Sequence, residues 1–251
     1  MQIKEKIKRN FSKSAPHYDE YAHLQKEIAG RLIEQIKETE FCQILDIGCG
    51  TGYLALALAE KFPNASLSAI DLAPGMIEYA SLKNPFANLQ FSEGDGEKLE
   101  FSDQRFDLVV SSSAFQWMDP NLSFTEVKRV IKPGGKFYFS LFGPATLAEL
   151  KSNEEEHRPN NLKAISLADL LRGIGFEDVA VASSIKRAIF PDFMSLLRLL
   201  KDLGAQSSSA PVGFGSRRIL VERALSYTRK FMDKDGIYAS FEVLFGKGRR
   251  A

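Results

Sequence analysis

Short apolar segments that alternate with helical segments impose the strongest limit on the fold of this chain. The alternation begins at residue 43, with predicted strands at 44–47, 67–71, 88–95, 106–113 and 136–142 and predicted helices at 53–62, 73–82 and 122–131. Strands that alternate with helices form parallel βαβ units, and strands that are apolar along most of their length are covered on both faces. We therefore expect a doubly wound α/β sheet.

The segments on either side of this region are predicted to be richer in helix. In residues 1–40, apolar side chains recur every three or four positions, which indicates amphipathic helices. After residue 142 we expect helices at 166–175, 193–204 and 216–232, strands at 176–190 and 237–248, and a flexible loop at 206–216. Two helices thus form an insertion between the last two strands. This insertion is either ordinary helical packing or a cover over the ligand end of the sheet.

Charge, hydropathy and cysteine content exclude several classes of protein. The formal net charge of +1 argues against a dedicated nucleic-acid binder, and no apolar run approaches the roughly 20 residues that span a bilayer. The basic N-terminus lacks the apolar region of a secretory signal. Cys42 and Cys49 read as reduced thiols, and the three histidines show no ligand spacing, so no metal site is expected. We predict a cytoplasmic protein that binds neither nucleic acid nor membrane.

A glycine-rich turn joins the first strand to the following helix. Gly48, Gly50 and Gly52 occupy it, and glycine there permits positive φ and a close approach of the backbone to a ligand. The start of the helix offers free N–H groups. Asp71 ends the next strand about 20 residues later, where an acid can accept hydrogen bonds from both hydroxyls of a ribose. The pattern predicts a nucleoside cofactor.

Asp46, just before the glycines, indicates which nucleoside cofactor binds. Its carboxylate would repel a diphosphate but could hold a cationic amino group. With the three glycines it resembles the D/E-x-G-x-G-x-G motif of class I S-adenosylmethionine methyltransferases. The resemblance implies that the turn contacts the methionine part, Asp71 the ribose and Leu72 the adenine, while Asp95 accepts from the adenine amino group. The expected cofactor-binding residues are Tyr18, Gln25, Asp46, Gly48, Cys49, Gly50, Gly52, Asp71, Leu72, Met76, Asp95, Gly96 and Ser111.

Aromatic residues follow the fourth strand and are expected to stand between cofactor and substrate. In this superfamily the end of that strand faces the transferable methyl group, so Phe115, Gln116 and Trp117 are candidate positioning residues together with Tyr18. Aromatic faces suit a sulfonium because the ring quadrupole attracts positive charge. For Phe115, a buried aromatic cluster is an equally good interpretation. For Tyr18, either the N-terminal helix closes over the cofactor or it simply packs on the domain.

Three distant segments extend the resemblance to one family. The segments FSKSAPHYDEYAHLQ (11–25), FQWMDP to TLAEL (115–150) and FEVLFGKGRR (241–250) resemble the malonyl-acyl-carrier-protein O-methyltransferases of biotin synthesis, the BioC family. The sequence departs from that family after the pair Glu149 and Leu150, where an Arg and then an Ala-Trp pair are frequent. Here Lys151 follows, and then a segment with an acidic stretch, Glu154 to Glu156.

This resemblance implies a complete architecture for residues 1–251. We expect a Rossmann-like class I methyltransferase fold with a mostly parallel seven-stranded sheet, an antiparallel last strand, helices on both faces and a helical insertion before the last strand. One domain would comprise a helical cap (1–40), a cofactor-binding core (41–190), a helical substrate cover (191–236) and the last strand (237–251).

The resemblance also implies a reaction, which is methyl transfer from S-adenosylmethionine to the free carboxylate of a malonyl thioester, carried by acyl carrier protein or coenzyme A. A carboxylate is ionised at neutral pH and needs no general base, so no catalytic acid or base is predicted. An arginine should hold it, and the candidates are Arg187, Arg198, Arg217 and Arg218. The alternatives are methylation of another small acid, or a non-methylating assembly factor that keeps the fold.

Overall fold

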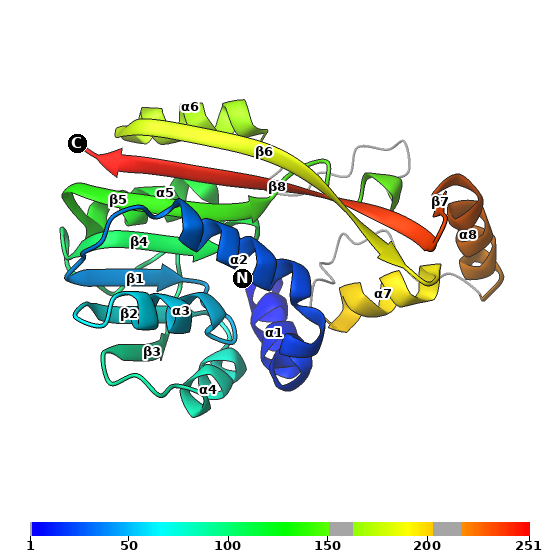
Figure 1. Ribbon diagram of the computed structural model, residues 1–251, viewed down its shortest axis with the longest axis horizontal. Coiled ribbons are helices and arrows are strands. Elements are labelled where there is room, and N and C mark those ends of the chain that lie inside the picture. The colour runs from blue at the N-terminus through cyan, green and yellow to red at the C-terminus, as the bar shows by residue number, and fades with distance from the viewer. Residues whose placement is uncertain (1, 151–162, 203–216) are drawn as a thin grey trace.

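The computed structural model describes residues 2–150, 163–202 and 217–251 (Figure 1). The helices are α1 (Gln2–Tyr21), α2 (His23–Gln35), α3 (Tyr53–Lys61), α4 (Pro74–Leu82), α5 (Pro120–Val130), α6 (Ala164–Ile174), α7 (Phe193–Asp202) and α8 (Arg217–Lys230), with short 3-10 helices at Phe115–Trp117 and Ala148–Leu150. The strands are β1 (Gln43–Ile47), β2 (Ser66–Asp71), β3 (Leu89–Glu93), β4 (Phe106–Ser112), β5 (Ile131–Phe142), β6 (Phe176–Phe190), β7 (Met232–Asp233) and β8 (Gly236–Arg250).

The strands form one mostly parallel sheet in the order β3-β2-β1-β4-β5-β8-β6. The first five strands of this order pair in parallel, and β8 is antiparallel to both β5 and β6. The predicted fold, including the antiparallel last strand, is confirmed. The two-residue β7, which pairs only with β8, was not predicted, because so short a segment carries no apolar pattern of its own.

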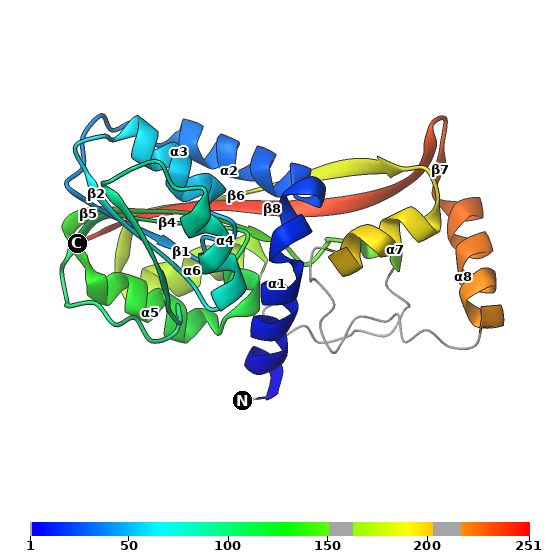
Figure 2. The ribbon, with the colours of Figure 1, turned by 90° about the horizontal axis from the view of Figure 1, so that it is seen from below.

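Helices cover both faces of the sheet, with α2 and α3 on one side and α5 and α6 on the other (Figure 2). Successive residues of the central strands β1 and β4 enter different cores, because side chains alternate across a strand. Ile44 and Leu108 pack with α2 and α3, whereas Leu45 and Val109 pack with α5 and α6. The near-continuous apolar content of the strands therefore reflects burial on both faces.

The start of β5 differs from the prediction. The strand was expected at 136–142, but α5 ends at Val130 and β5 begins at Ile131, so that Pro133, Gly134 and Gly135 lie within β5. The pairing with β4 shifts register between Phe106 and Leu108, so the proline and glycines form a bulge in the ladder. Gly175, with a φ of 95°, ends α6 as a left-handed cap.

The N-terminal segment forms two helices that break at Ala22. One of them, α1, packs against α4 at the carboxyl end of the sheet, between α4 and α7 (Figures 1 and 2). Gly75 makes the close approach to α4 possible, because a Cβ atom there would lie 2.6 Å from the backbone oxygen of Ser12. The Gly75 N–H also donates to the Ser12 hydroxyl, at 3.3 Å.

The C-terminal part of the sheet continues beyond the other strands as a long ribbon of β6 and β8, which ends at α7, α8 and β7 (Figure 1). Phe193, Leu196, Tyr227 and Ile237 form a separate apolar cluster at this end. The predicted loop at 206–216 and the acidic stretch Glu154 to Glu156 lie outside the described residues. In the part of the chain that the structure describes, no helix is long and apolar enough to cross a membrane.

Two glycines of β8 provide a test of the packing between β5 and β8. A Cβ atom on Gly246 would overlap the buried ring of Phe139, whereas one on Gly248 would lie 3.3 Å from the Phe176 Cβ. We expect Gly246→Ala to lower the free energy of unfolding by about 2–3 kcal/mol through overpacking, and the matched Gly248→Ala by less than about 1 kcal/mol. Urea denaturation of both variants measures this, and equal effects would contradict the packing described.

Candidate active site

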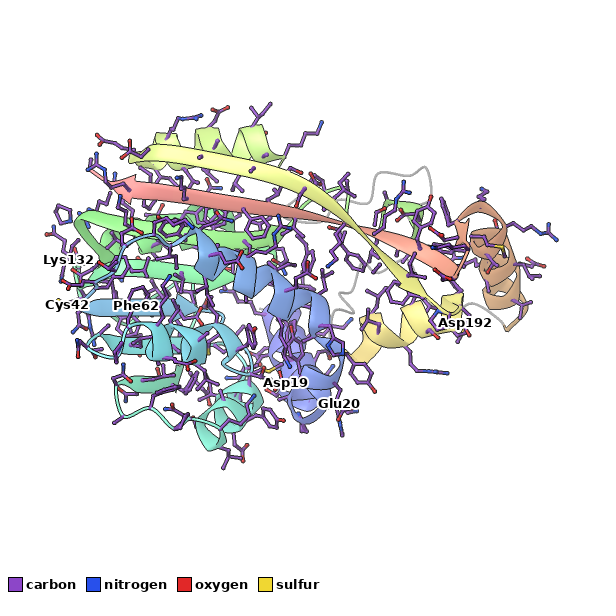
Figure 3. All side chains as sticks on the ribbon, in the orientation of Figure 1. Asp19, Glu20, Cys42, Phe62, Lys132 and Asp192 are labelled. Carbon is purple, nitrogen blue, oxygen red and sulfur yellow. The ribbon has the colours of Figure 1, made fainter. Side chains whose placement is uncertain are left out.

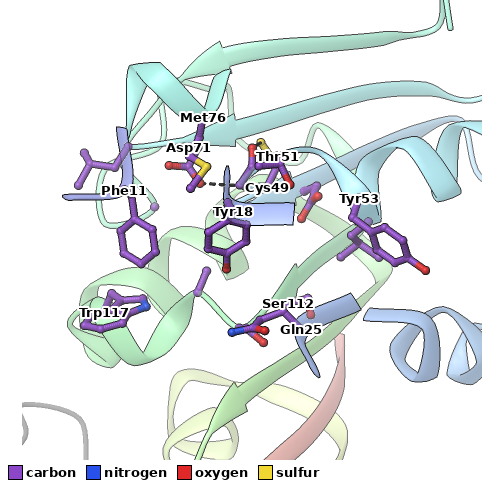
Figure 4. Close-up of a pocket in the computed structure, with 18 of the residues that line it drawn as sticks. Phe11, Tyr18, Gln25, Cys49, Thr51, Tyr53, Asp71, Met76, Ser112 and Trp117 are labelled. Atoms are coloured by element: carbon purple, nitrogen blue, oxygen red, sulfur yellow. Dashed lines mark hydrogen bonds between the residues drawn. The ribbon is translucent and has the colours of Figure 1, made fainter. Parts of the chain in front are cut away.

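A pocket of about 1060 Å³, including the part open to solvent, lies at the carboxyl ends of β1, β2 and β4, beneath α1 (Figure 4). Its floor is the glycine turn after β1, where Gly48, Gly50 and Gly52 have φ values of 72°, 54° and 88°. A parallel sheet of this kind binds ligands at this edge. Twelve of the predicted residues line the pocket: Tyr18, Gln25, Asp46, Gly48, Cys49, Gly50, Asp71, Leu72, Met76, Asp95, Gly96 and Trp117.

The three glycines of the turn have different roles. Gly50 has open space where a Cβ would be, so its backbone is available to a ligand. A Cβ on Gly48 would overlap Ala114, so this glycine allows the turn to pack on the segment after β4. Gly52, the cap of α3, does not line the pocket; it faces the ring of Phe91, from which a Cβ atom at this position would lie only 2.8 Å. A glycine at this position allows the close packing of the Phe91 ring and the left-handed backbone conformation.

Asp46 is the most unusual group in the pocket. Its side chain is 1% exposed, and neither carboxylate oxygen has a hydrogen-bond partner. Burial, and secondarily the charge of Asp71, raise the pKa of Asp46 to about 8. A buried carboxylate is normally paired, because desolvation of an isolated charge is costly. The pocket therefore lacks a cation at this point, and a ligand with an amino group would supply it.

Asp71, at the end of β2, is better satisfied. It accepts hydrogen bonds from the Gly50 N–H at 2.9 Å and the Ala73 N–H at 2.8 Å. Burial raises its pKa, and these two hydrogen bonds oppose that shift. The carboxylate thus fixes the glycine turn and retains lone pairs for a ligand hydroxyl. Burial, followed by the charge of Asp71, also raises the pKa of Tyr18, whose hydroxyl therefore stays protonated.

The end of the pocket that holds Asp95 is closed by α1. Lys4 forms ion pairs with Asp95 at 2.6 Å and Glu97 at 2.7 Å. Gly96 lies close to the floor, since a Cβ there would come within 2.7 Å of the Met118 sulfur. Asp95 and Gly96 thus line the pocket as predicted, but the sequence pattern did not indicate the ion pair between Asp95 and Lys4.

The segment after β4 contributes only part of the predicted aromatic wall. Trp117 lines the pocket and makes an edge contact with Phe11 of α1, at 5.6 Å between ring centroids (Figure 4). Phe115 is buried in a cluster with Phe124, Phe137 and Phe139, which matches the alternative interpretation for this residue. Gln116 does not line the pocket and donates to the Ser113 carbonyl at 2.6 Å.

Ser111 is likewise absent from the lining. It is fully buried, and its hydroxyl donates to the Ile47 carbonyl at 2.7 Å, so it joins β4 to β1. Ser112 and Ser113, the next two residues, line the pocket instead. The sequence identified the strand end correctly but not the residues that face the ligand.

On one face of α1 only Tyr18 was predicted, and three further residues of that face were missed. Lys4, Ile7 and Phe11 line the pocket in line with Tyr18, at helical spacings of three, four and seven. This periodicity could have been read from the sequence. Asp19, labelled in Figure 3, and Lys26 also line the pocket. The Asp19 carboxylate accepts a hydrogen bond from the Thr51 hydroxyl at 2.8 Å.

The predicted arginines lie elsewhere. Arg187 is exposed on β6 and stacks over the Tyr238 ring at 4.6 Å, and Arg198 is exposed on α7; neither lines the pocket. The side chains of Arg217 and Arg218 lie outside the described residues. Cys42 and Cys49 are both free thiols, and among the described residues no three His, Cys, Asp or Glu side chains gather to hold a metal ion.

Comparisons with known proteins find relatives of this chain by sequence and by fold. Residues 45–139 match the family model described as a methyltransferase domain. A malonyl-acyl-carrier-protein O-methyltransferase of Geobacter sulfurreducens is 34% identical, with 98% of each chain covered, and one of Methylococcus capsulatus is 33% identical over 94% of this chain and 90% of that protein. Phosphoethanolamine N-methyltransferase 2 of Haemonchus contortus, solved with S-adenosylmethionine, shares the fold, with a TM-score of 0.56 at 18% identity over 89% of this chain and 52% of its own.

Asp46 allows a test through the pH dependence of stability. Folding raises its pKa from about 4 to about 8, so the unfolded chain loses this proton first and stability falls as the pH rises between those values. Asp46→Asn removes this penalty. We expect its melting temperature to equal that of the native protein near pH 4 and to exceed it increasingly up to about pH 8. Calorimetric melting curves without ligand measure the difference, and a less stable variant at pH 8 would contradict the unpaired carboxylate.

Proposed function

The chain belongs to the malonyl-acyl-carrier-protein O-methyltransferase family of S-adenosylmethionine-dependent methyltransferases, and on that premise we propose that it methylates the free carboxylate of a malonyl thioester to start pimeloyl assembly in biotin biosynthesis. The assignment of the substrate rests on the similarity over 98% of the chain, because the fold alone is shared by methyltransferases of many substrates.

The pocket fits S-adenosylmethionine. When bound, this cofactor supplies a methyl group on a positively charged sulfur. Asp46, buried and unpartnered, would hold its amino group, and Asp71 would accept from the ribose hydroxyls. Leu72 and Met76 would flank the adenine. Asp95 keeps lone pairs for the adenine amino group beside its contact with Lys4.

No residue of this chain needs to remove a proton from the substrate. A malonyl carboxylate is ionised at neutral pH, since ordinary carboxyl groups titrate near pH 4. No histidine is found among the described residues that line the pocket. The chain's contribution is to align the carboxylate with the methyl group and to exclude water. Trp117, Phe11 and Tyr18 form an aromatic wall suited to both tasks, because their rings attract a sulfonium and displace solvent.

The substrate side of the proposal rests on the C-terminal helices. We propose that residues 191–236 form a cover for the malonyl thioester and that an arginine from this region or from β6 binds its carboxylate. The acidic surface of an acyl carrier protein would favour the basic residues of this region, among them Arg198, Arg229 and Lys230. The two free thiols fit a reducing compartment, so we place the reaction in the cytoplasm.

Methyl transfer to a panel of acceptors tests the proposal. We expect methyl ester formation on malonyl carrier protein, slower formation on malonyl-CoA, and none on acetyl carrier protein, the matched control that lacks a free carboxylate. Mass spectrometry of the carrier detects the added methyl group. Methylation of a free small acid, with no product on either malonyl thioester, would favour a different substrate. Restored growth of a biotin auxotroph that lacks this methyltransferase would link the activity to the pathway.

A further inference from the structure

Two cationic side chains are found among the described residues that line the pocket, Lys4 and Lys26. They differ in their surroundings. The Lys4 ammonium is matched by two carboxylates, those of Asp95 and Glu97. The Lys26 ammonium donates to the main-chain oxygen of Asp19 at 3.1 Å and lies 3.4 Å from the nearer oxygen of its carboxylate. Lys26 is therefore the less fully paired of the two.

The charges around Asp19 leave a positive excess beside Lys26. The Asp19 carboxylate accepts hydrogen bonds from Lys83 at 2.7 Å and from the Thr51 hydroxyl at 2.8 Å. These contacts lower its pKa against the effect of burial, so it is ionised. Two ammonium groups thus share one carboxylate, and Lys83 is the closer partner. The charge of Lys26 is left largely uncompensated at the pocket.

The contact between Asp19 and Thr51 places this excess charge at the far end of the glycine turn. Thr51 follows Gly50 and precedes α3, whose first residues, Tyr53 and Leu54, also line the pocket. The first N–H groups of a helix have no partner within it and favour an anion. The start of α3 therefore adds to the preference that Lys26 creates.

The other end of the same turn has the opposite character. Asp46 precedes the glycines and has no hydrogen-bond partner, and no cation contributes to its electrostatic environment. One pocket thus offers an unpaired carboxyl group before the turn, which a bound ammonium would hold as an anion, and an excess cation after it. A ligand with an ammonium and a carboxylate on neighbouring atoms complements both, which is the pattern of an amino acid.

We propose that Lys26 binds the carboxylate of the methionine part of S-adenosylmethionine and so positions the cofactor on the glycine turn. Lys26 is a positioning residue in this assignment, which concerns the cofactor alone and holds whichever acid accepts the methyl group. The bound carboxylate would take the free donor positions of the Lys26 ammonium, while Asp19 keeps the side chain directed at the pocket.

Calorimetric binding of two ligands tests the proposal without turnover. S-adenosylmethionine carries the carboxylate, and decarboxylated S-adenosylmethionine lacks only that group. We expect Lys26→Gln to weaken binding of the first by about tenfold to hundredfold, equivalent to about 1.4–2.8 kcal/mol, and to leave binding of the second unchanged within about twofold. Lys26→Arg, which keeps the charge, should restore most of the affinity for the first.

Lys83→Gln is the matched control, because Lys83 contacts the same Asp19 carboxylate but does not line the pocket. It should weaken both ligands equally or neither. An equal loss of affinity for both ligands in Lys26→Gln would overturn the proposal. It would show that the substitution loosens the contact of α2 with α1 and does not act through the carboxylate. Unchanged binding of S-adenosylmethionine would also overturn it. If only the KM for the malonyl thioester then rose, Lys26 would hold the substrate carboxylate instead.

Discussion

The burial of an unpaired carboxylate at the carboxyl end of β1 is the constraint from which the site follows. Asp46 is enclosed between the apolar strands of the sheet and the glycine turn, and in the described part of the chain no group forms a hydrogen bond to its carboxyl oxygens. Such a group destabilises the fold unless it is protonated or meets a cation. A pocket of this kind is selective, because it rejects phosphates and favours a ligand that brings its own ammonium group. The buried carboxyl group of Asp46 thus lowers the stability of the free protein, and under the proposed function the same group binds the amino group of the cofactor.

The N-terminal helix completes what the sheet begins. Gly75 lets α1 approach α4, Asp19 joins α1 to the glycine turn, and Lys4 joins it to the loop after β3. One face of α1 then forms a side of the pocket, with Phe11 and Tyr18 next to Trp117. Under the proposed function, these contacts would exclude water from the place where the methyl group is transferred. Since the proposed acceptor is already ionised, the chain needs only to align its carboxylate with the methyl group and to exclude water.

The sequence was informative where local patterns determine structure. Strands buried on both faces show as apolar runs, and the motif from Asp46 to Gly52 together with Asp71 located one side of the pocket. The sequence was less informative where contacts between distant segments determine the orientation or pairing of a residue. Ser111 and Ser112 differ only in which way they face, and a strand of small polar residues does not reveal this. The pairing of Lys4 with Asp95 joins residues 91 positions apart, and the bulge at the start of β5 depends on register with β4. The arginine candidates followed from chemistry alone, without a pattern to place them.

Proton release on cofactor binding tests most directly whether Asp46 receives the ammonium group. In the free protein at about pH 7 this carboxyl is mostly protonated, because its pKa is about 8. A bound ammonium would lower that pKa, so S-adenosylmethionine should displace a proton, measurable by calorimetry in buffers of different ionisation enthalpy. The account predicts this release in the native protein, its loss in Asp46→Asn, and its absence with 5′-methylthioadenosine, which lacks the amino-acid end. The same proton release in Asp46→Asn, or none in the native protein, would contradict it.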